Sequence, residues 1–372
     1  MSFSEKIRVI EEEMGKTQIN KATEHHLGRL KAKLAKLKSE AVDRAKAKGG
    51  GVNFDVRKSG DASIALVGFP SVGKSSLLNR LTDAKAATEA YAFTTLTCIP
   101  GILIYKGAKI QILDLPGILE GAYSGLGRGK EVLAVARTAN MVLLVVDVFN
   151  PRLDVIINEL WNIGIRINEK PPNINIKHKF RGGITINTTI KLTKLDEKTI
   201  LAIMSEYGIH NANIVIRDDI TVDQLIDVLI GNRVYLPAIA LLNKADLVSK
   251  EYIKELQNKL NIQILAVSAK TGYKLEEVKK TIYRKLNFIR IYTRSRSIKK
   301  ENDNDEPMMM QKGETIKRLC QKLHREMIDN FRYAQVWGDS AKHPGQKVGL
   351  EHVLKDKDIV TIVTHTGYSK QD

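Results

Sequence analysis

The stretch Gly68-Phe69-Pro70-Ser71-Val72-Gly73-Lys74-Ser75 decides the fold of this chain. It follows the apolar run Ile64-Ala65-Leu66-Val67 and precedes a segment with helical character from Ser76 to Leu81. A loop of the pattern G-x-x-x-x-G-K-[ST] between a strand and a helix is typical of a phosphate-binding P-loop, because its backbone N–H groups can point at phosphate oxygens. Lys74 is then predicted to reach the β- and γ-phosphates, and the Ser75 hydroxyl to ligate Mg²⁺. A glycine turn followed by an unrelated lysine is the plain alternative.

A second run, Ile110-Gln111-Ile112-Leu113-Asp114-Leu115-Pro116-Gly117, is predicted to be a buried strand that ends in Asp-x-x-Gly. An Asp at the carboxyl end of such a strand can hold Mg²⁺ through water, and the Gly117 N–H can sense the γ-phosphate. Alone the motif is weak, since many strands end in turns that contain Asp and Gly.

Two later runs concern the base. In Ala238-Ile239-Ala240-Leu241-Leu242-Asn243-Lys244-Ala245-Asp246, the Asp246 carboxylate can accept from two N–H groups, which guanine offers and adenine does not. Asn243 can serve the O6/N7 edge of guanine, and the stem of Lys244 can lie along the ring. The fourth run, Ile264 to Lys270, places the Ala269 N–H to donate to O6. Each run alone could be a core strand with a turn, but four in this order predict a site for GTP or GDP.

These runs resemble the motifs of the Obg-related GTPases in their order and in their residues. The segment Phe93-Thr94-Thr95-Leu96-Thr97 and the glycine-rich run Glu120 to Gly129 resemble that group as well. The segments around them resemble the developmentally regulated GTP-binding proteins of archaea and eukaryotes, on three stretches: 26–34, 205–212 and 336–340. The resemblance extends from about Lys21 to about Thr366. It implies that Thr95 in switch I is a Mg²⁺ ligand that engages only when a γ-phosphate is present, with Thr94 as the competing assignment.

Together the motifs and the resemblance predict three overlapping sets of site residues. The catalytic residues are Lys74, Thr95 and Gly117, and the metal ligands are Ser75, Thr95 and Asp114. The predicted nucleotide contacts are Gly68, Phe69, Pro70, Ser71, Val72, Gly73, Lys74, Ser75, Ser76, Phe93, Thr94, Thr95, Asp114, Leu115, Pro116, Gly117, Asn243, Lys244, Asp246, Ser268, Ala269 and Lys270.

Switch II departs from the small signalling GTPases at the position after Gly117. Ile118 stands there in place of a Gln that could orient the attacking water. Intrinsic hydrolysis is therefore expected to be slow unless a backbone group, a bound monovalent cation such as K⁺, or a partner supplies the missing element. Arg128 could act as a finger in cis, although an exposed switch residue is the more ordinary reading.

Composition bounds the class of protein. At 372 residues the chain is long enough for two or three domains, and its charge of +17 with a pI near 9.6 indicates a polyanionic partner, RNA before DNA or a membrane. General solubility is the alternative explanation of that charge. Cys98 and Cys320 lie far apart without metal-ligand spacing, which is typical of a reducing compartment. No signal peptide or apolar stretch of transmembrane length is present, so a cytoplasmic location is expected.

The predicted fold class is α/β, with a doubly wound P-loop GTPase domain at 59–165 and 236–287. A helical hairpin at 1–58 precedes this domain. An α+β insert at 166–235 interrupts it and resembles the ribosomal-protein-like insertion of the family, with a pure spacer as the alternative. A β-grasp module that resembles the TGS domain follows at 288–372, and its basic side chains make an RNA surface plausible.

Two apolar stripes at helical spacing predict the hairpin, and its second helix is strongly basic. The first stripe is Ile7, Ile10 and Met14, and the second is Leu27, Leu30, Leu34, Leu37 and Ala41. Nine basic side chains occur between Lys21 and Lys48, against Glu24, Glu40 and Asp43: Lys21, Arg29, Lys31, Lys33, Lys36, Lys38, Arg44, Lys46 and Lys48. An ordinary solvated face and a surface that faces RNA or a ribosome both remain open.

The resemblance implies a translation-associated GTPase that acts on or near ribosomes. The eukaryotic members of the family work with a dedicated protein partner, and the sequence leaves open whether this chain has one. The alternatives are a ribosome-assembly GTPase of the Obg type, and an RNA-binding scaffold with a nucleotide switch and negligible turnover.

Overall fold

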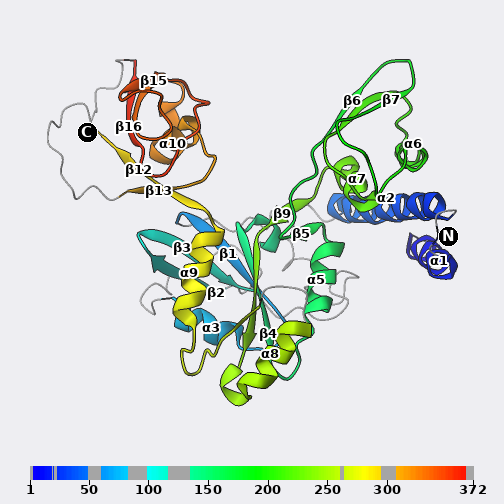
Figure 1. The fold of residues 1–372 in the computed structure, drawn as a ribbon, viewed down its shortest axis with the longest axis horizontal. Coiled ribbons are helices and arrows are strands. Elements are labelled where there is room, and N and C mark those ends of the chain that lie inside the picture. The colour runs from blue at the N-terminus through cyan, green and yellow to red at the C-terminus, as the bar shows by residue number, and fades with distance from the viewer. Residues whose placement is uncertain are drawn as a thin grey trace. The chain divides into compact units, whose positions relative to one another are not determined.

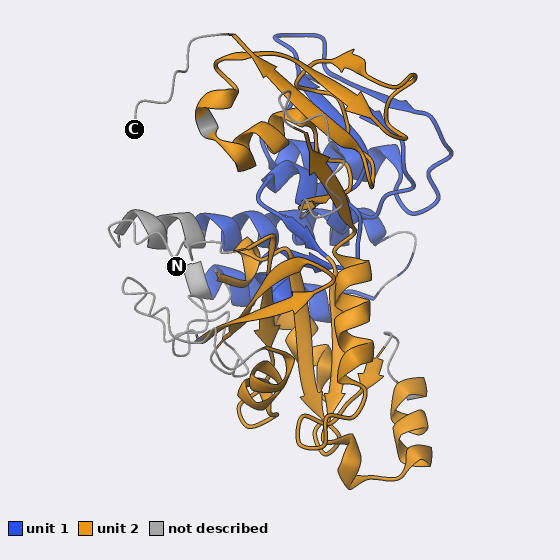
Figure 2. Ribbon diagram, turned by 90° about the vertical axis from the view of Figure 1, so that its left-hand side faces the viewer, with its two compact units in different colours: residues 1–55, 160–236 blue, residues 56–159, 237–372 orange. Residues whose placement is uncertain are grey.

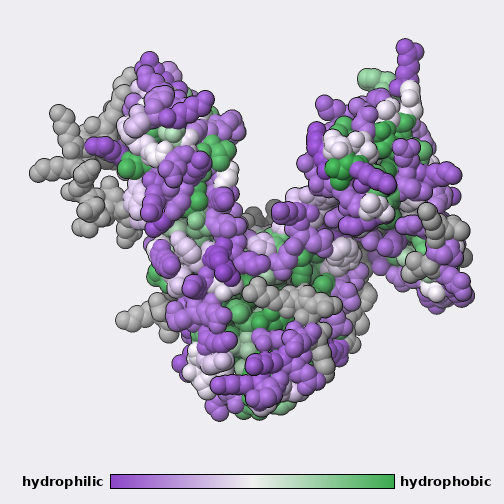
Figure 3. All heavy atoms as spheres, viewed as in Figure 1, coloured by the Kyte–Doolittle hydropathy of each residue, from purple (hydrophilic) through white to green (hydrophobic). Residues whose placement is uncertain are grey.

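The structure is a computed structural model that describes residues 3–18, 20, 23–48, 60–82, 99–115, 135–259, 264–294 and 307–365. Switch I, switch II from Pro116 onward and Arg128 lie outside the described residues. The chain divides into two compact units, which Figure 2 colours separately: residues 1–55 with 160–236, and residues 56–159 with 237–372. On the face that Figure 3 shows, hydrophilic residues cover most of the visible surface of each unit.

A six-stranded sheet organises the second unit, in the order β11-β10-β4-β1-β3-β2. All neighbours are parallel except β2 and β3, which form a hairpin around the Lys106-Gly107 turn. The inner strands are continuous apolar runs because both faces of the sheet are covered. The strands are β1 (Ala62–Val67), β2 (Ile99–Tyr105), β3 (Ala108–Asp114), β4 (Met141–Asp147), β10 (Ala238–Asn243) and β11 (Ile264–Ala266).

Helices lie on both faces of this sheet (Figure 1). On one face, α3 (Lys74–Leu81) and α9 (Leu275–Lys285) pack their buried leucine, valine and isoleucine side chains against β1, β3 and β4. Helix α5 (Leu153–Asn162) lies on the opposite face, and α8 (Lys250–Lys259) precedes β11 in the chain. Helices on both sides of a parallel sheet confirm the predicted doubly wound class.

The C-terminal module has a sheet of its own in the order β13-β12-β16-β14-β15. Helix α10 (Ile316–Leu323) buries Ile316, Leu319 and Cys320 against this sheet, and the short helix η4 (Arg325–Met327) follows. The strands are β12 (Phe288–Thr293), β13 (Met308–Gln311), β14 (Phe331–Trp337), β15 (Gln346–Val348) and β16 (Ile359–Thr364). The mixed sheet with one helix is the β-grasp arrangement that the sequence predicts.

The first unit contains the hairpin and the insert. The helices are α1 (Phe3–Lys16), α2 (Glu24–Lys48), α6 (Glu197–Glu206) and α7 (Val222–Ile230). The strands are β5 (Ile165–Ile167), β6 (Ile174–His178), β7 (Ile184–Thr188), β8 (Ala212–Ile216) and β9 (Val234–Leu236). Strands β6 and β7 lie on either side of Arg181-Gly182-Gly183 in the sequence. They do not pair with each other, because β8 lies between them in the sheet.

Helix α2 packs directly on the insert. Ala32 is fully buried in the core that the insert strands and α6 and α7 build, and a side chain at Gly28 would collide with Thr199. Polar contacts support the packing: Lys31 Nζ lies 2.9 Å from Asp223 Oδ2, and Lys36 Nζ donates to the Glu206 carbonyl at 2.9 Å. The hairpin and the insert, which the sequence prediction separates, therefore share one core.

No helix in the described part of the chain is both long enough and apolar enough to span a membrane.

Candidate nucleotide-binding site

The P-loop lies between β1 and α3, and its two fixed glycines are required by geometry. A Cβ at Gly68 would collide with the Val145 carbonyl of β4. Gly73 has a φ of 93°, and a Cβ there would collide with the side-chain amide of Asn243. Lack of space excludes a side chain at Gly68, and both the backbone conformation and the lack of space exclude one at Gly73.

Lys74 is 8 % exposed and its ammonium donates to two carbonyls of its own loop, those of Gly68 (3.2 Å) and Phe69 (2.9 Å). Burial lowers the pKa of Lys74, and the charge of nearby Asp114 partly offsets that effect. The ammonium therefore lies inside the loop that is predicted to cradle phosphates, where a negative phosphate oxygen would stabilise its charged form.

Asp114 and Ser75 meet at the end of β3. The Ser75 hydroxyl donates to Asp114 Oδ2 at 2.5 Å, while Asp114 Oδ1 is buried and has no hydrogen-bond partner. A buried carboxylate oxygen without a partner is costly unless a cation or a donor satisfies it. The pair of oxygen donors, one hydroxyl and one carboxylate, suits Mg²⁺. These residues fit the predicted ion, and when bound it would neutralise charge on the phosphate oxygens.

Asn243, the last residue of β10, connects two loops. It is 3 % exposed; its Nδ2 donates to the Val72 carbonyl at 2.8 Å, and its Oδ1 accepts from the Ala269 N–H at 3.0 Å. The P-loop is thus tied to the loop after β11 through one side chain. The Ala269 N–H that is predicted to donate to guanine O6 already serves Asn243, so a base would have to share that donor.

Lys244 has a left-handed backbone, with a φ of 63°, and its Nζ lies 2.8 Å from Asp147 Oδ2 at the end of β4. Burial alone would raise the pKa of Asp147, but hydrogen bonds from Lys244 and from the Asn150 and Phe149 amides outweigh it and hold the pKa below its usual range. Asp147 is therefore an ionised group that positions the lysine of the Asn-Lys-x-Asp motif. In the sequence it is only an aspartate at the end of an apolar run, which carries no sign of this role.

A cavity of about 680 Å³ opens at the carboxyl ends of β10 and β11. The exposed Asp246, in the short helix η3 (Ala245–Leu247), is part of its lining. The lining consists of Gly73, Ser76, Asn79, Arg80, Asn243, Lys244, Asp246, Leu247, Ser268, Ala269 and Lys270. Most of these residues are predicted nucleotide contacts, and the strand ends of a doubly wound sheet are where such folds bind ligands.

Arg80 is a lining residue that the sequence does not single out. Its Nη2 donates to the Lys270 carbonyl at 3.0 Å, which ties the last turn of α3 to the loop after β11. A helix residue seven positions after Gly73 carries no motif that could have revealed this contact.

The structure brings together the predicted residues of the P-loop, Asp114 and the two base-recognition loops. The side chains of Val72 and Leu115 are 3 % and 1 % exposed, so these two residues can contribute backbone groups only. Five predicted site residues lie outside the described residues: Phe93, Thr94, Thr95, Pro116 and Gly117.

Comparison with known proteins identifies the family. The chain is 55 % identical over 370 residues to a GTP-binding protein of Methanocaldococcus jannaschii, which covers 98 % of this chain and 93 % of the relative. It is 48 % identical to developmentally-regulated GTP-binding protein 1 of Xenopus laevis, over 96 % of this chain and 98 % of that protein. The chain belongs to the developmentally regulated GTP-binding protein family.

Family models match three consecutive segments of this family member. Residues 63–178 match a model described as 50S ribosome-binding GTPase, residues 181–288 match the C-terminal region of the MMR_HSR1 domain, and residues 289–364 match the TGS domain. A further relative, with 47 % identity over 96 % of this chain and 98 % of its own length, is named ribosome-interacting GTPase 1 of Saccharomyces cerevisiae. The chain is therefore a GTPase with a TGS domain, as the sequence predicts.

Proposed function

We propose that this family member is a Mg²⁺-dependent GTPase that hydrolyses GTP to GDP and phosphate and acts on or near ribosomes in the cytoplasm, as a translation-associated factor. The observation that carries the nucleotide assignment is the cavity lined by Asn243, Lys244 and Asp246 beside the P-loop. A carboxylate exposed in that cavity selects a base with two adjacent N–H donors, and guanine has them.

Each described residue of the site has a distinct role in this proposal. Lys74 and the P-loop amides stabilise negative charge on the transferring phosphoryl group. Ser75 and the unpaired oxygen of Asp114 hold the metal ion. Asn243 and the ion pair of Lys244 with Asp147 fix the loops that contact the base. Thr95 and Gly117 complete the site as the residues that respond to the γ-phosphate.

Turnover without a partner is expected to be slow, since Ile118 offers no group that could orient water. Either a potassium ion or a partner protein supplies the missing group in this proposal. A single-turnover measurement with the protein alone separates a slow enzyme from a scaffold, which would show no hydrolysis above background.

The ribosome assignment is supported by the printed names of the yeast relative and of the matching family model, and by the net charge of +17. It is tested by co-sedimentation of the protein, bound to a non-hydrolysable GTP analogue, with ribosomes. Binding to translating ribosomes that weakens with GDP would support the translation role. Binding only to precursor particles would favour ribosome assembly instead, and binding to neither would refute both assignments.

A further inference from the structure

The insert contains a long stretch without acidic residues. Residues 170–195 include Lys170, Lys177, Lys179, Arg181, Lys191 and Lys194, and no Asp or Glu. The stretch spans β6, β7 and the loop between them. A segment with one sign of charge attracts a polyanion when its charges are not neutralised by neighbours.

Carboxylates elsewhere in the insert are largely engaged in internal contacts. Asp219 accepts from the Thr193 hydroxyl at 2.6 Å and from the Thr193 N–H at 2.8 Å, and Asp218 accepts from the Asn173 N–H at 2.9 Å. Asp227 pairs with Arg166 and Arg233 at 2.6 and 2.8 Å. Asp227 is neutralised by its two arginine partners. Asp218 and Asp219 keep their charge, but they follow β8 at the end of the sheet opposite the loop between β6 and β7, which leaves basic side chains to set the charge around that loop.

One face of the three-stranded sheet is not covered by a helix of the insert. The isoleucines of the other face pack under α6 and α7. The uncovered face presents polar side chains with one valine: Asn175, Lys177, Thr185, Asn187, Asn213 and Val215. Asn187 Nδ2 donates to Asn213 Oδ1 at 2.8 Å, so these side chains are already ordered. Amides and a lysine on an open sheet can contact phosphates and base edges.

The loop at the end of this sheet exposes an aromatic ring between two cations. Phe180 is fully exposed, at 106 %, between Lys179 and Arg181. Two hydrogen bonds hold the loop: the Lys179 N–H donates to the Asn211 carbonyl (3.0 Å), and the Gly183 N–H donates to Asn211 Oδ1 (2.8 Å). Asn211 therefore holds both ends of the loop that carries the exposed Phe180.

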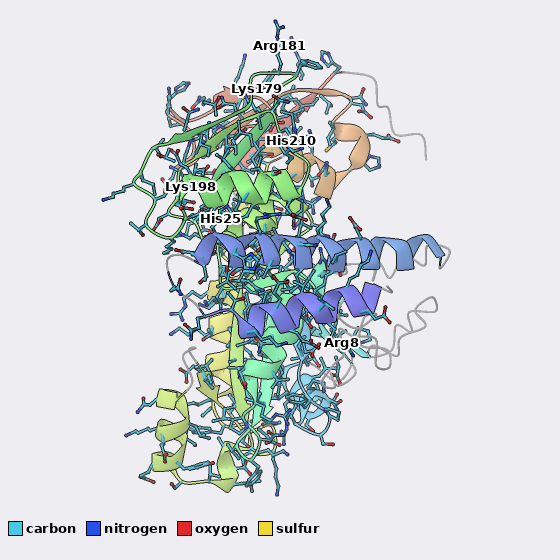
Figure 4. The ribbon with its side chains drawn as sticks, turned by 90° about the vertical axis from the view of Figure 1, so that its right-hand side faces the viewer. Arg8, His25, Lys179, Arg181, Lys198 and His210 are labelled. Carbon is cyan, nitrogen blue, oxygen red and sulfur yellow. The ribbon has the colours of Figure 1, made fainter. Side chains whose placement is uncertain are left out.

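The same contacts bring the loop before β8 to this end of the sheet. We call His178, Lys179, Phe180, Arg181 and His210 the insert tip. Figure 4 shows Arg181 extending from the outer end of the insert, with Lys179 and His210 at the same end. Among the residues that the structure describes, no carboxylate pairs with Arg181 or His210.

We propose that the insert tip and the adjoining uncovered sheet face bind RNA, with Phe180 stacked on an unpaired base and Lys177, Lys179 and Arg181 on phosphates. Base stacking on aromatic side chains beside a basic surface is how proteins hold single-stranded RNA. A protein-docking surface would instead present contiguous apolar area at its centre, whereas Phe180 stands alone among polar side chains. The proposal deepens the proposed function, since ribosomal RNA is the expected source of the ligand.

The test uses two variants of the full-length chain and matched controls. Phe180→Ala removes the ring, and the double variant Lys179→Gln/Arg181→Gln removes two charges. The controls lie on helix α8, where Tyr252, Lys250 and Lys254 are exposed: Tyr252→Ala and Lys250→Gln/Lys254→Gln. Unchanged thermal unfolding and GTP affinity establish that each variant is folded.

Binding to a short labelled single-stranded RNA of mixed sequence is measured by fluorescence anisotropy over a range of salt. Phe180→Ala is expected to weaken binding about 5- to 150-fold without changing the salt dependence. The double variant is expected to lower the slope of log affinity against log salt by about 1.4, for two phosphate contacts to a single strand. The α8 variants should bind like the parent.

Co-sedimentation with ribosomes distinguishes ribosomal RNA from another RNA as the ligand. It also tests the RNA-binding tip separately from the proposed function on ribosomes. Loss of both RNA and ribosome binding in the tip variants supports the proposal with ribosomal RNA as the source, and loss of RNA binding alone supports it with another RNA. Parent-like RNA affinity in both tip variants overturns it, and parent-like RNA affinity with lost ribosome binding assigns the tip to a ribosomal protein. A parent chain that binds RNA but no ribosomes refutes the proposed function and leaves the tip proposal standing.

Discussion

Replacing Asn243 by alanine removes a side chain that ties the P-loop to the loop after β11. The change leaves the Val72 carbonyl and the Ala269 N–H without their partners, at a position where Asn243 is 3 % exposed. Each buried polar group left unpaired costs about 1–3 kcal/mol, and entering water recovers part of that. The total is about 2–4 kcal/mol, which corresponds to a nucleotide affinity roughly 30- to 900-fold lower if binding requires both loops in place.

The measurement is the dissociation constant of fluorescent GTP and GDP, and of 7-deaza-GTP, which lacks the N7 acceptor of guanine. If Asn243 acts mainly by holding the loops, Asn243→Ala lowers the affinity for GTP, GDP and 7-deaza-GTP by the same factor. If its main contribution is a hydrogen bond to the base edge, the parent already binds 7-deaza-GTP weakly. The substitution then lowers the affinity for 7-deaza-GTP only slightly.

Asn79 provides the matched control because it lines the same cavity from α3 and is exposed. Asn79→Ala is expected to change the dissociation constants less than about threefold, as surface substitutions usually do. An affinity of Asn243→Ala equal to that of Asn79→Ala would refute the reasoning. So would a loss confined to ligands that carry N7.

Three further predictions concern the other parts of the site. Asp246→Asn should weaken GTP tens- to several hundredfold, since a bidentate charged contact is worth about 2–4 kcal/mol, and should favour xanthosine triphosphate; equal GTP affinity in mutant and parent would exclude Asp246 from the site. Lys74→Ala and Ser75→Ala should each abolish hydrolysis, and full turnover of Ser75→Ala at low Mg²⁺ would contradict the metal assignment. GTP turnover should be faster in potassium than in sodium at equal ionic strength, and less so in Ser71→Ala; identical rates in both salts would show that a monovalent cation plays no part.

The nucleotide site could be predicted from the sequence because each motif residue sits where a strand ends. Parallel strands bring their carboxyl ends to one edge, so β1, β3 and β10 place Lys74, Asp114 and Asn243 together once the sheet is assumed. The two glycines of the P-loop were likewise predictable, since the loop pattern itself demands a backbone without Cβ atoms.

The contacts that position those residues could not be predicted. Asp147 and Lys244 are 97 positions apart, and Arg80 and Lys270 are 190 positions apart. An aspartate after an apolar strand is a common turn residue, and only the order of β4 beside β10 makes it a partner for Lys244. The partner of Lys244 depends on the order of strands in the sheet, which cannot be deduced from a single sequence.

The joining of hairpin and insert has a similar cause. The leucine stripe of α2 predicts packing against α1. The contact with the insert uses Gly28, Ala32 and Ala35 on another stripe, where small side chains allow close approach of α6. Small residues at a spacing of three and four are common in solvent-facing helices as well, so their packing partner appears only in the folded structure.

Long-range contacts also change where an RNA-binding surface is expected, from the hairpin to the insert. The charge count on α2 favours an RNA-facing helix, yet three of its lysines are engaged within the unit: Lys31 with Asp223, Lys36 with the Glu206 carbonyl, and Lys38 with Glu11. The first two of these partners lie 192 and 170 positions away in the sequence. A charge count over neighbouring residues therefore does not reveal them. In the insert, Asp218 and Asp219 keep their charge because their partners are neutral, but they follow β8 at the end of the sheet away from the insert tip. Lys177 remains exposed on its strand, and the Lys179 ammonium donates only to the neutral Thr185 hydroxyl, so it keeps its charge. Charge that is available to a polyanion is what remains after ion pairing, and in the described part of the chain Arg181 of the insert tip has no carboxylate partner.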